Sequence, residues 1–124
     1  MATPSEQHKE QARIDQAIAA EIIELTPEFW TAATLIVRKD IKPDGMNGIA
    51  HHIFSPQGHR EIIQPDEVLF GLIGELFELF SKHGADLRCA TYNVSEEPDG
   101  QWRMTAEYGY DDAAVRKQAW PEGV

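Results

Sequence analysis

The sequence predicts a single α+β domain, an antiparallel sheet of four or five strands with two helices packed on one face. Two observations lead to this prediction. Apolar residues recur at the spacing of an amphipathic helix in two separate segments. Short β-branched or alternating stretches lie between and after them, joined by Pro, Asn and Gly turn signals that favour antiparallel pairing. The expected order of elements is α-β-β-β-α-β-β.

The first helix is expected to follow a flexible polar tail of residues 1–6 and to end before Pro27. Its apolar stripe consists of Ile14, Ile18, Ile22 and Leu25. The second helix is expected from Asp66 to Lys82, because proline and acids suit a first helical turn. Gly84 is expected to end it in a left-handed conformation. Gly71 and Gly74 indicate either close approach of this helix to the sheet or simple tolerance.

The five expected strands are residues 34–38, 49–54, 60–63, 87–94 and 101–108. The last two form a hairpin around Pro98-Asp99-Gly100, a turn in which proline presets φ and glycine takes the unusual conformation. From Gln101 to Tyr108 apolar and polar residues alternate strictly, as in a half-buried strand. A short helix from Asp112 to Ala119 is an option for the end of the chain.

Composition indicates one globular domain spanning residues 1–124, and it restricts the class of partner. The 124 residues are 42% hydrophobic, with a formal net charge of −10. This charge disfavours nucleic acid and anionic membranes and favours a basic protein, although an acidic surface can also serve solubility alone. The polar N-terminus lacks an apolar signal core, so a cytoplasmic location is expected. The single cysteine, Cys89, is expected to be a buried structural thiol.

The acidic hairpin and its C-terminal exit form the candidate partner-binding site. From Glu96 to Asp112 the chain has six acids and one base. The candidate contact residues are Glu96, Glu97, Asp99, Glu107, Tyr110, Asp111 and Asp112. Because they share one hairpin, they are expected to face a single basic groove, with Tyr110 as an aromatic anchor. The alternative for Asp111 and Asp112 is that they cap a short helix and need no partner.

Neither a catalytic nor a metal-binding constellation is recognisable in the sequence, so no enzyme activity, metal or cofactor is expected. His51 and His52 are adjacent in an expected strand, and their side chains therefore point to opposite faces. No serine lies in a nucleophile-elbow motif. Trp30 and Trp102 are expected in the core, whereas Trp120 suits either the core or an exposed anchor.

With these residues placed, the chain resembles the YezG-like family of bacterial toxin-immunity proteins. The similarity spans roughly residues 12 to 112. The matching segments are residues 14–25, the junction Pro27-Glu-Phe-Trp30, residues 34–38, residues 69–80 and residues 99–112. The resemblance implies a non-enzymatic protein that binds and blocks a secreted or contact-delivered toxin, often a nuclease.

Two other classes of function stay open at the level of sequence. One is a small hydrolase that uses Asp111, Asp112 or a histidine, which would require a deep pocket lined by those residues. The other is an adaptor module that pairs with itself through an exposed sheet edge, giving a homodimer.

Overall fold

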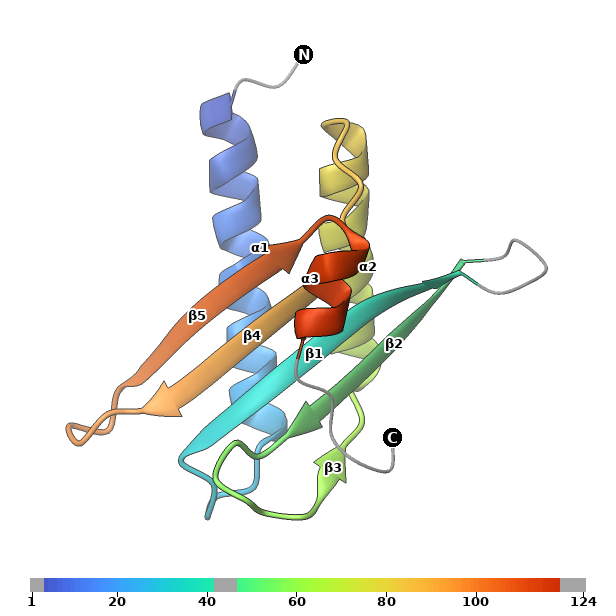
Figure 1. Ribbon diagram of the computed structural model, residues 1–124. Helices are drawn as coiled ribbons and strands as arrows, with labels where there is room; N and C mark the ends of the chain where they lie inside the picture. The colour runs from blue at the N-terminus through green and yellow to red at the C-terminus, as the bar shows by residue number, and fades with distance from the viewer. Residues whose placement is uncertain (1–3, 42–46, 119–124) are drawn as a thin grey trace.

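The computed structural model describes residues 4–41 and 47–118, which form an α+β fold with one five-stranded antiparallel sheet (Figure 1). The elements are α1 (Pro4–Leu25), β1 (Ala32–Ile41), β2 (Asn47–Phe54), β3 (Ile62–Ile63), α2 (Glu67–Lys82), β4 (Cys89–Glu96), β5 (Trp102–Gly109) and α3 (Asp112–Lys117). The strands lie in the order β3-β2-β1-β4-β5. The predicted fold class and element order are confirmed, and the optional helix at the end of the chain is α3.

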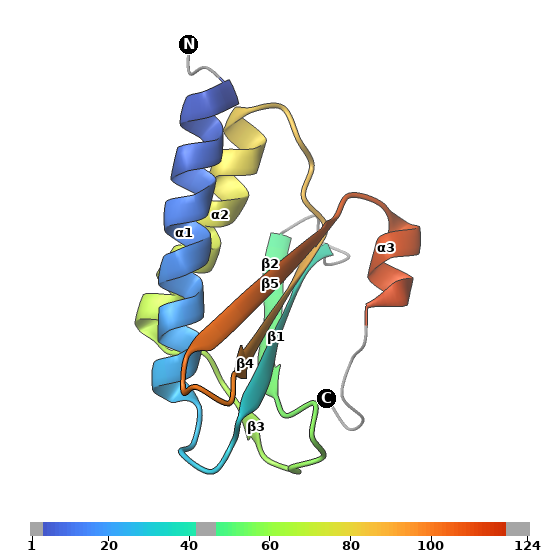
Figure 2. The same ribbon diagram turned by 90° about the vertical axis from the view of Figure 1, so that its left-hand side faces the viewer.

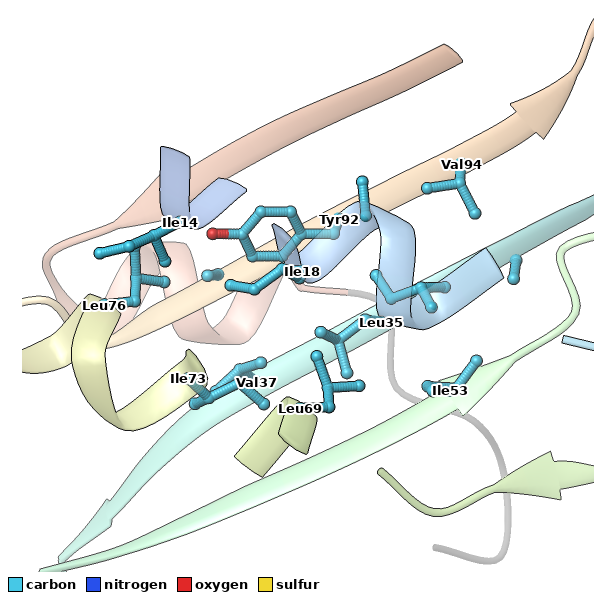
Figure 3. Close-up of a cluster of buried hydrophobic side chains, with 14 of the residues drawn as sticks. Ile14, Ile18, Leu35, Val37, Ile53, Leu69, Ile73, Leu76, Tyr92 and Val94 are labelled. Carbon is cyan, nitrogen blue, oxygen red and sulfur yellow. The ribbon is translucent and has the colours of Figure 1, made fainter. Parts of the chain in front are cut away.

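Two helices cover one face of the sheet, and α3 lies on the opposite side (Figure 2). The core fills the layer between α1, α2 and the central strands (Figure 3). Ile14, Ile18 and Ile22 of α1 are at most 1% exposed, as the helical spacing predicts. They pack with Leu35 of β1 and Tyr92 of β4, so the two middle strands contribute most to the core.

The expected tail of residues 1–6 was partly wrong, because α1 begins at Pro4. Proline suits a first helical turn, where its missing N–H is not needed. The residues that follow are polar good helix formers, and Glu6 in the first turn complements the helix dipole. These first residues carry no apolar stripe, so a prediction based on hydrophobic periodicity starts the helix too late.

Both ends of α2 follow from its sequence. The Asp66 side chain accepts a hydrogen bond from Leu69 N–H at 2.8 Å and so caps the N-terminus. At the other end Gly84 has φ +79°, and the N–H of Ala85 donates to Phe80 O at 2.9 Å. This is a Schellman motif, as expected for His83-Gly84.

The interior glycines of α2, Gly71 and Gly74, reflect tolerance and not close packing on the sheet. Both are exposed, and a Cβ added at either would meet no atom within 4 Å.

The strand boundaries differ by a few residues from those expected. The strand expected from residue 87 begins at Cys89 and continues to Glu96, because its end pairs with the start of β1. Leu87 is nevertheless 2% exposed and belongs to the core. The third strand is reduced to two residues, Ile62 and Ile63. Ala119 and Trp120 lie outside the described residues.

A polar contact joins the first helix to the hairpin. The Asp15 carboxylate of α1 accepts hydrogen bonds from the hydroxyls of Tyr92 at 2.7 Å and Tyr108 at 2.5 Å. Burial, followed by the bond to Asp15, raises the pKa of Tyr108 to about 12 and raises the pKa of Tyr92 further above its ordinary value. This contact fixes the hairpin relative to the helical layer.

Within residues 4–41 and 47–118, no helix is long and apolar enough to cross a membrane.

Candidate functional site

The seven candidate residues of the acidic hairpin do not form one cluster. Glu96, Glu97 and Asp99 lie at the β4–β5 turn, whereas Tyr110, Asp111 and Asp112 follow the far end of β5. An eight-residue strand at about 3.3 Å per residue separates these two groups by about 25 Å. A single small basic groove therefore cannot contact both groups on one copy of the chain.

Two acids near the turn have structural partners. Asp99 accepts a hydrogen bond from Gln101 N–H at 2.9 Å, which stabilises the turn, and Gly100 has φ +86°. Glu97 forms an ion pair with Arg103 at 3.0 Å. Glu96 is exposed and has no ion-pair partner among the described residues. Glu96 is therefore the turn acid most available to a partner.

The exit from β5 has its own compensating cations. Asp111 is the N-cap of α3 and accepts a hydrogen bond from Ala114 N–H at 2.8 Å, which is the capping role that the alternative expected for this residue. Asp112 pairs with Arg88 at 3.1 Å. The two acids are also matched by the two bases in the last turn of α3. Tyr110 is 51% exposed, and its ring lies 6.0 Å from that of Phe80.

Glu107 lies apart from both groups, on the sheet face opposite α1 and α2. It is exposed and alternates with Ala106 and Tyr108, which pack against the core, so its side chain projects from the other face of β5, the side on which α3 lies. It borders a hollow of about 170 Å³ whose walls include Cys89 and Gln118. The Gln118 amide donates to Ala90 O at 2.8 Å, so α3 is held against the sheet here. Cys89 is 4% exposed as predicted, and burial raises the pKa of its thiol.

Three loops meet at the end of the sheet where the β4–β5 turn lies, and we call residues 26–31, 55–61 and 96–101 the loop end. Glu96 N–H donates to Thr31 O at 2.8 Å, which joins the hairpin to the first loop. The Gln57 amide donates to Thr31 Oγ1 at 2.7 Å, which joins the second. These bonds place side chains from three distant parts of the sequence on one surface.

An aromatic cluster occupies this loop end. The His59 ring stacks on Trp30 with a centroid distance of 5.5 Å and an interplanar angle of 6°. The Phe29 ring meets His59 edge to face at 5.1 Å. Trp30 is 1% exposed, whereas Phe29 is 61% exposed. The cluster therefore presents a supported aromatic side chain to solvent.

The charge of the loop end is strongly negative. It contains five acids and one base. The acids are Glu28, Glu61, Glu96, Glu97 and Asp99, and the base is Arg60. By contrast, residues 110–118 contain two acids and two bases. The structure thus divides the acidic hairpin into a negative turn and a locally neutral exit.

Phe29 and His59 were not among the predicted site residues. The junction Pro27-Glu-Phe-Trp30 was a visible signal, but adjacent aromatics in a loop do not reveal which one is exposed. His59 was recognised only as a turn residue, because its stacking on Trp30 depends on a contact between distant segments.

A cavity of about 570 Å³ lies between α2, the β1–β2 hairpin and the loop before β4. Its walls include Ile49, Phe77 and Leu87, and the Lys39–Asp86 ion pair of 3.2 Å lies in its lining. Neither Asp111, Asp112 nor a histidine is among its described lining residues. In the part of the chain that the structure describes, no three His, Cys, Asp or Glu side chains are grouped to hold a metal ion.

No protein-family model matches this chain, and no curated protein matches it as a relative.

Proposed function

We propose that this chain is an immunity protein that binds a cognate basic toxin through its loop end and blocks it by direct contact. The carrying observation is that an exposed aromatic, Phe29, belongs to the loop end, whose three converging loops carry five acids and one base. The resemblance of the sequence to YezG-like immunity proteins supports the same class of function. The toxin is secreted or contact-delivered, and nucleases are a common class of such toxins.

The physical basis is a combination common in tight interfaces, in which an aromatic anchor is surrounded by charged residues. An aromatic anchor supplies buried apolar area at low entropic cost, and surrounding acids steer a basic partner toward it. Phe29 is already supported by His59 and Trp30, so little order has to be gained on binding. Glu96 is the acid best suited to pair with a toxin Lys or Arg, because it has no ion-pair partner among the described residues.

The test is binding to the toxin domain encoded beside this chain, followed by paired variants. Phe29→Ala is expected to weaken binding about tenfold or more, a typical effect for a central aromatic. Phe70→Ala is the matched control, because Phe70 is 53% exposed but lies on α2. Glu96→Lys is expected to lower the association rate and its salt dependence. Glu78→Lys is the control, because Glu78 is also exposed but lies toward the C-terminal end of α2.

Three results would contradict the proposal. The first is failure to bind any toxin domain encoded next to the chain. The second is equal loss of binding in Phe29→Ala and Phe70→Ala. The third is a binding site that Tyr110→Ala abolishes while Phe29→Ala leaves it intact, which would favour the exit of β5.

A further inference from the structure

Among residues 4–41 and 47–118, no strand pairs with the outer edge of β5. β5 is the last strand of the sheet that these residues form, and its partner there is β4. Figure 2 views the molecule from this side and shows β5 in front, with α1 and α3 to its two sides. No other described strand or helix lies along this edge. An edge strand of eight residues offers a ready template for pairing with another strand.

The direction of the backbone groups on this edge follows from the hydrogen-bond pattern. Glu97 N–H donates to Gln101 O at 2.6 Å, so odd-numbered residues of the hairpin pair with β4. Backbone groups alternate in an antiparallel ladder, so the N–H and C=O of even-numbered residues face outward. The outward set on β5 is Trp102, Met104, Ala106 and Tyr108.

Only one antiparallel self-pairing uses all four outward residues. It places Trp102 opposite Tyr108 of a second copy and Met104 opposite Ala106 of that copy. The two-fold axis then passes between the two copies of Thr105 and is perpendicular to the sheet. Both helical layers consequently lie on the same side of the joined sheet.

This register also matches the charges. It places Arg103 opposite Glu107 of the second copy, and symmetry repeats the pair. Both side chains project from the sheet face opposite α1 and α2, at a position without backbone bonds to the second copy, where side chains approach most closely. Shifting the register by two residues either way places Arg103 opposite Thr105 or Gly109 instead. The complementarity is therefore specific to one register.

The Arg103 side chain is accessible to a second copy of the chain, although it already forms one ion pair. Its side chain is 77% exposed, and its ion pair with Glu97 lies at the surface, where such pairs contribute little. On the other face of β5, Trp102, Met104 and Tyr108 pack against the core but are only partly buried. A second strand beside β5 would cover more of their apolar surface.

We propose that two copies of this chain form a two-fold dimer by antiparallel β5–β5 pairing centred on Thr105, with Arg103–Glu107 ion pairs on either side of the axis. The dimer joins two five-stranded sheets into one continuous sheet. This inference does not depend on toxin binding.

Sedimentation equilibrium of the full chain tests the proposal. The wild type is expected to approach twice the chain mass of 14.0 kDa as its concentration rises. Arg103→Glu and Glu107→Arg should each raise the dissociation constant about tenfold or more, because each turns two attractive contacts into like-charge contacts. The double variant Arg103→Glu/Glu107→Arg should restore it to within a few-fold of the wild-type value.

Arg60→Glu and Glu61→Arg are the matched controls, because they make the same charge changes in the loop before β3, at the opposite edge of the sheet. Both should leave the dissociation constant nearly unchanged. Ala106→Pro removes one outward N–H without affecting the ladder to β4, and should weaken the dimer while circular dichroism confirms the fold. A monomeric wild type would overturn the proposal. So would a dimer that both charge reversals leave unchanged, which would instead favour a contact through exposed Phe70 of α2.

Discussion

Replacing Asp15 by alanine is expected to destabilise the fold by about 3 kcal/mol. The carboxylate accepts hydrogen bonds from the hydroxyls of Tyr92 and Tyr108. Hydrogen bonds to a charged group contribute roughly 1.5–3 kcal/mol each, and a buried hydroxyl without an acceptor costs about 1–3 kcal/mol. Tyr92 is 0% exposed, so its hydroxyl cannot turn to water. Tyr108 is only partly buried, so losing its hydrogen bond should cost less stability than losing that of Tyr92.

Urea unfolding followed by tryptophan fluorescence measures this effect, with an unchanged m-value as the sign that the variant folds similarly. Tyr92→Phe and Tyr108→Phe each remove one donor and should cost about 1 kcal/mol or slightly more. A double-mutant cycle between Asp15→Ala and Tyr92→Phe should give a coupling energy of about 1 kcal/mol or more. An Asp15→Ala loss below about 1 kcal/mol, with no coupling, would refute the reasoning.

The same contact predicts a loss of stability in alkaline solution. An ordinary tyrosine has a pKa near 10, whereas the folded state raises the pKa of Tyr108 to about 12 and that of Tyr92 further above its ordinary value. The folded protein therefore retains these protons more strongly than the unfolded chain. Their contribution is complete below about pH 10 and is lost as the pH rises toward 12. In the Tyr92→Phe/Tyr108→Phe variant, the free energy of unfolding should change less over this range.

Three smaller perturbations follow from other contacts. Gly74→Ala should raise the free energy of unfolding by about 0.5–1 kcal/mol, whereas Gly84→Ala should lower it by about 1 kcal/mol, because only Gly84 needs a positive φ. Gly109→Ala should lower the thermal midpoint and increase the amide exchange of α3, because its Cβ would lie 2.5 Å from Cys89 Sγ and 2.6 Å from Cβ of Ala114 in α3. A hydrogen bond to Asp66 and, second, burial raise the pKa of Glu21, so the folded state disfavours the charged form of this carboxyl. Glu21→Gln should therefore stabilise the fold at about pH 7, where the unfolded chain carries this charge. Denaturant unfolding should show that this gain disappears near pH 4, where the carboxyl is protonated in both states.

Much of the fold could be predicted because its signals are local. The apolar stripe of α1 and the cap residues of α2 lie within a few positions of the features they specify. The alternation along β5 likewise assigned its two faces correctly, as the burial pattern confirms. The first turn of α1 was missed because polar residues give no hydrophobic period. The end of β4 was misplaced because the pairing of its last residues with the start of β1 depends on contacts between distant segments.

The candidate site was less accessible to sequence reasoning. Counting acids from Glu96 to Asp112 treated neighbours in sequence as neighbours in space, although a whole strand separates the two ends. The sequence also could not show that Arg88 approaches Asp112. Phe29 gains its significance from His59, thirty positions later, and from acids of a third loop. Such convergence depends on strand order, which no local pattern contained.

The two proposals use different surfaces, so their tests can be separated. Arg103 and Glu107 lie along β5, whereas Phe29 and Glu96 lie at the loop end. Ala106→Pro should weaken the dimer and leave the intrinsic affinity of each chain for toxin nearly unchanged, because it changes no charge at the loop end. Phe29→Ala should weaken toxin binding and leave the dimer intact. If Ala106→Pro weakened both equally while remaining folded, the toxin surface would extend onto β5, and Glu107 would belong to it after all.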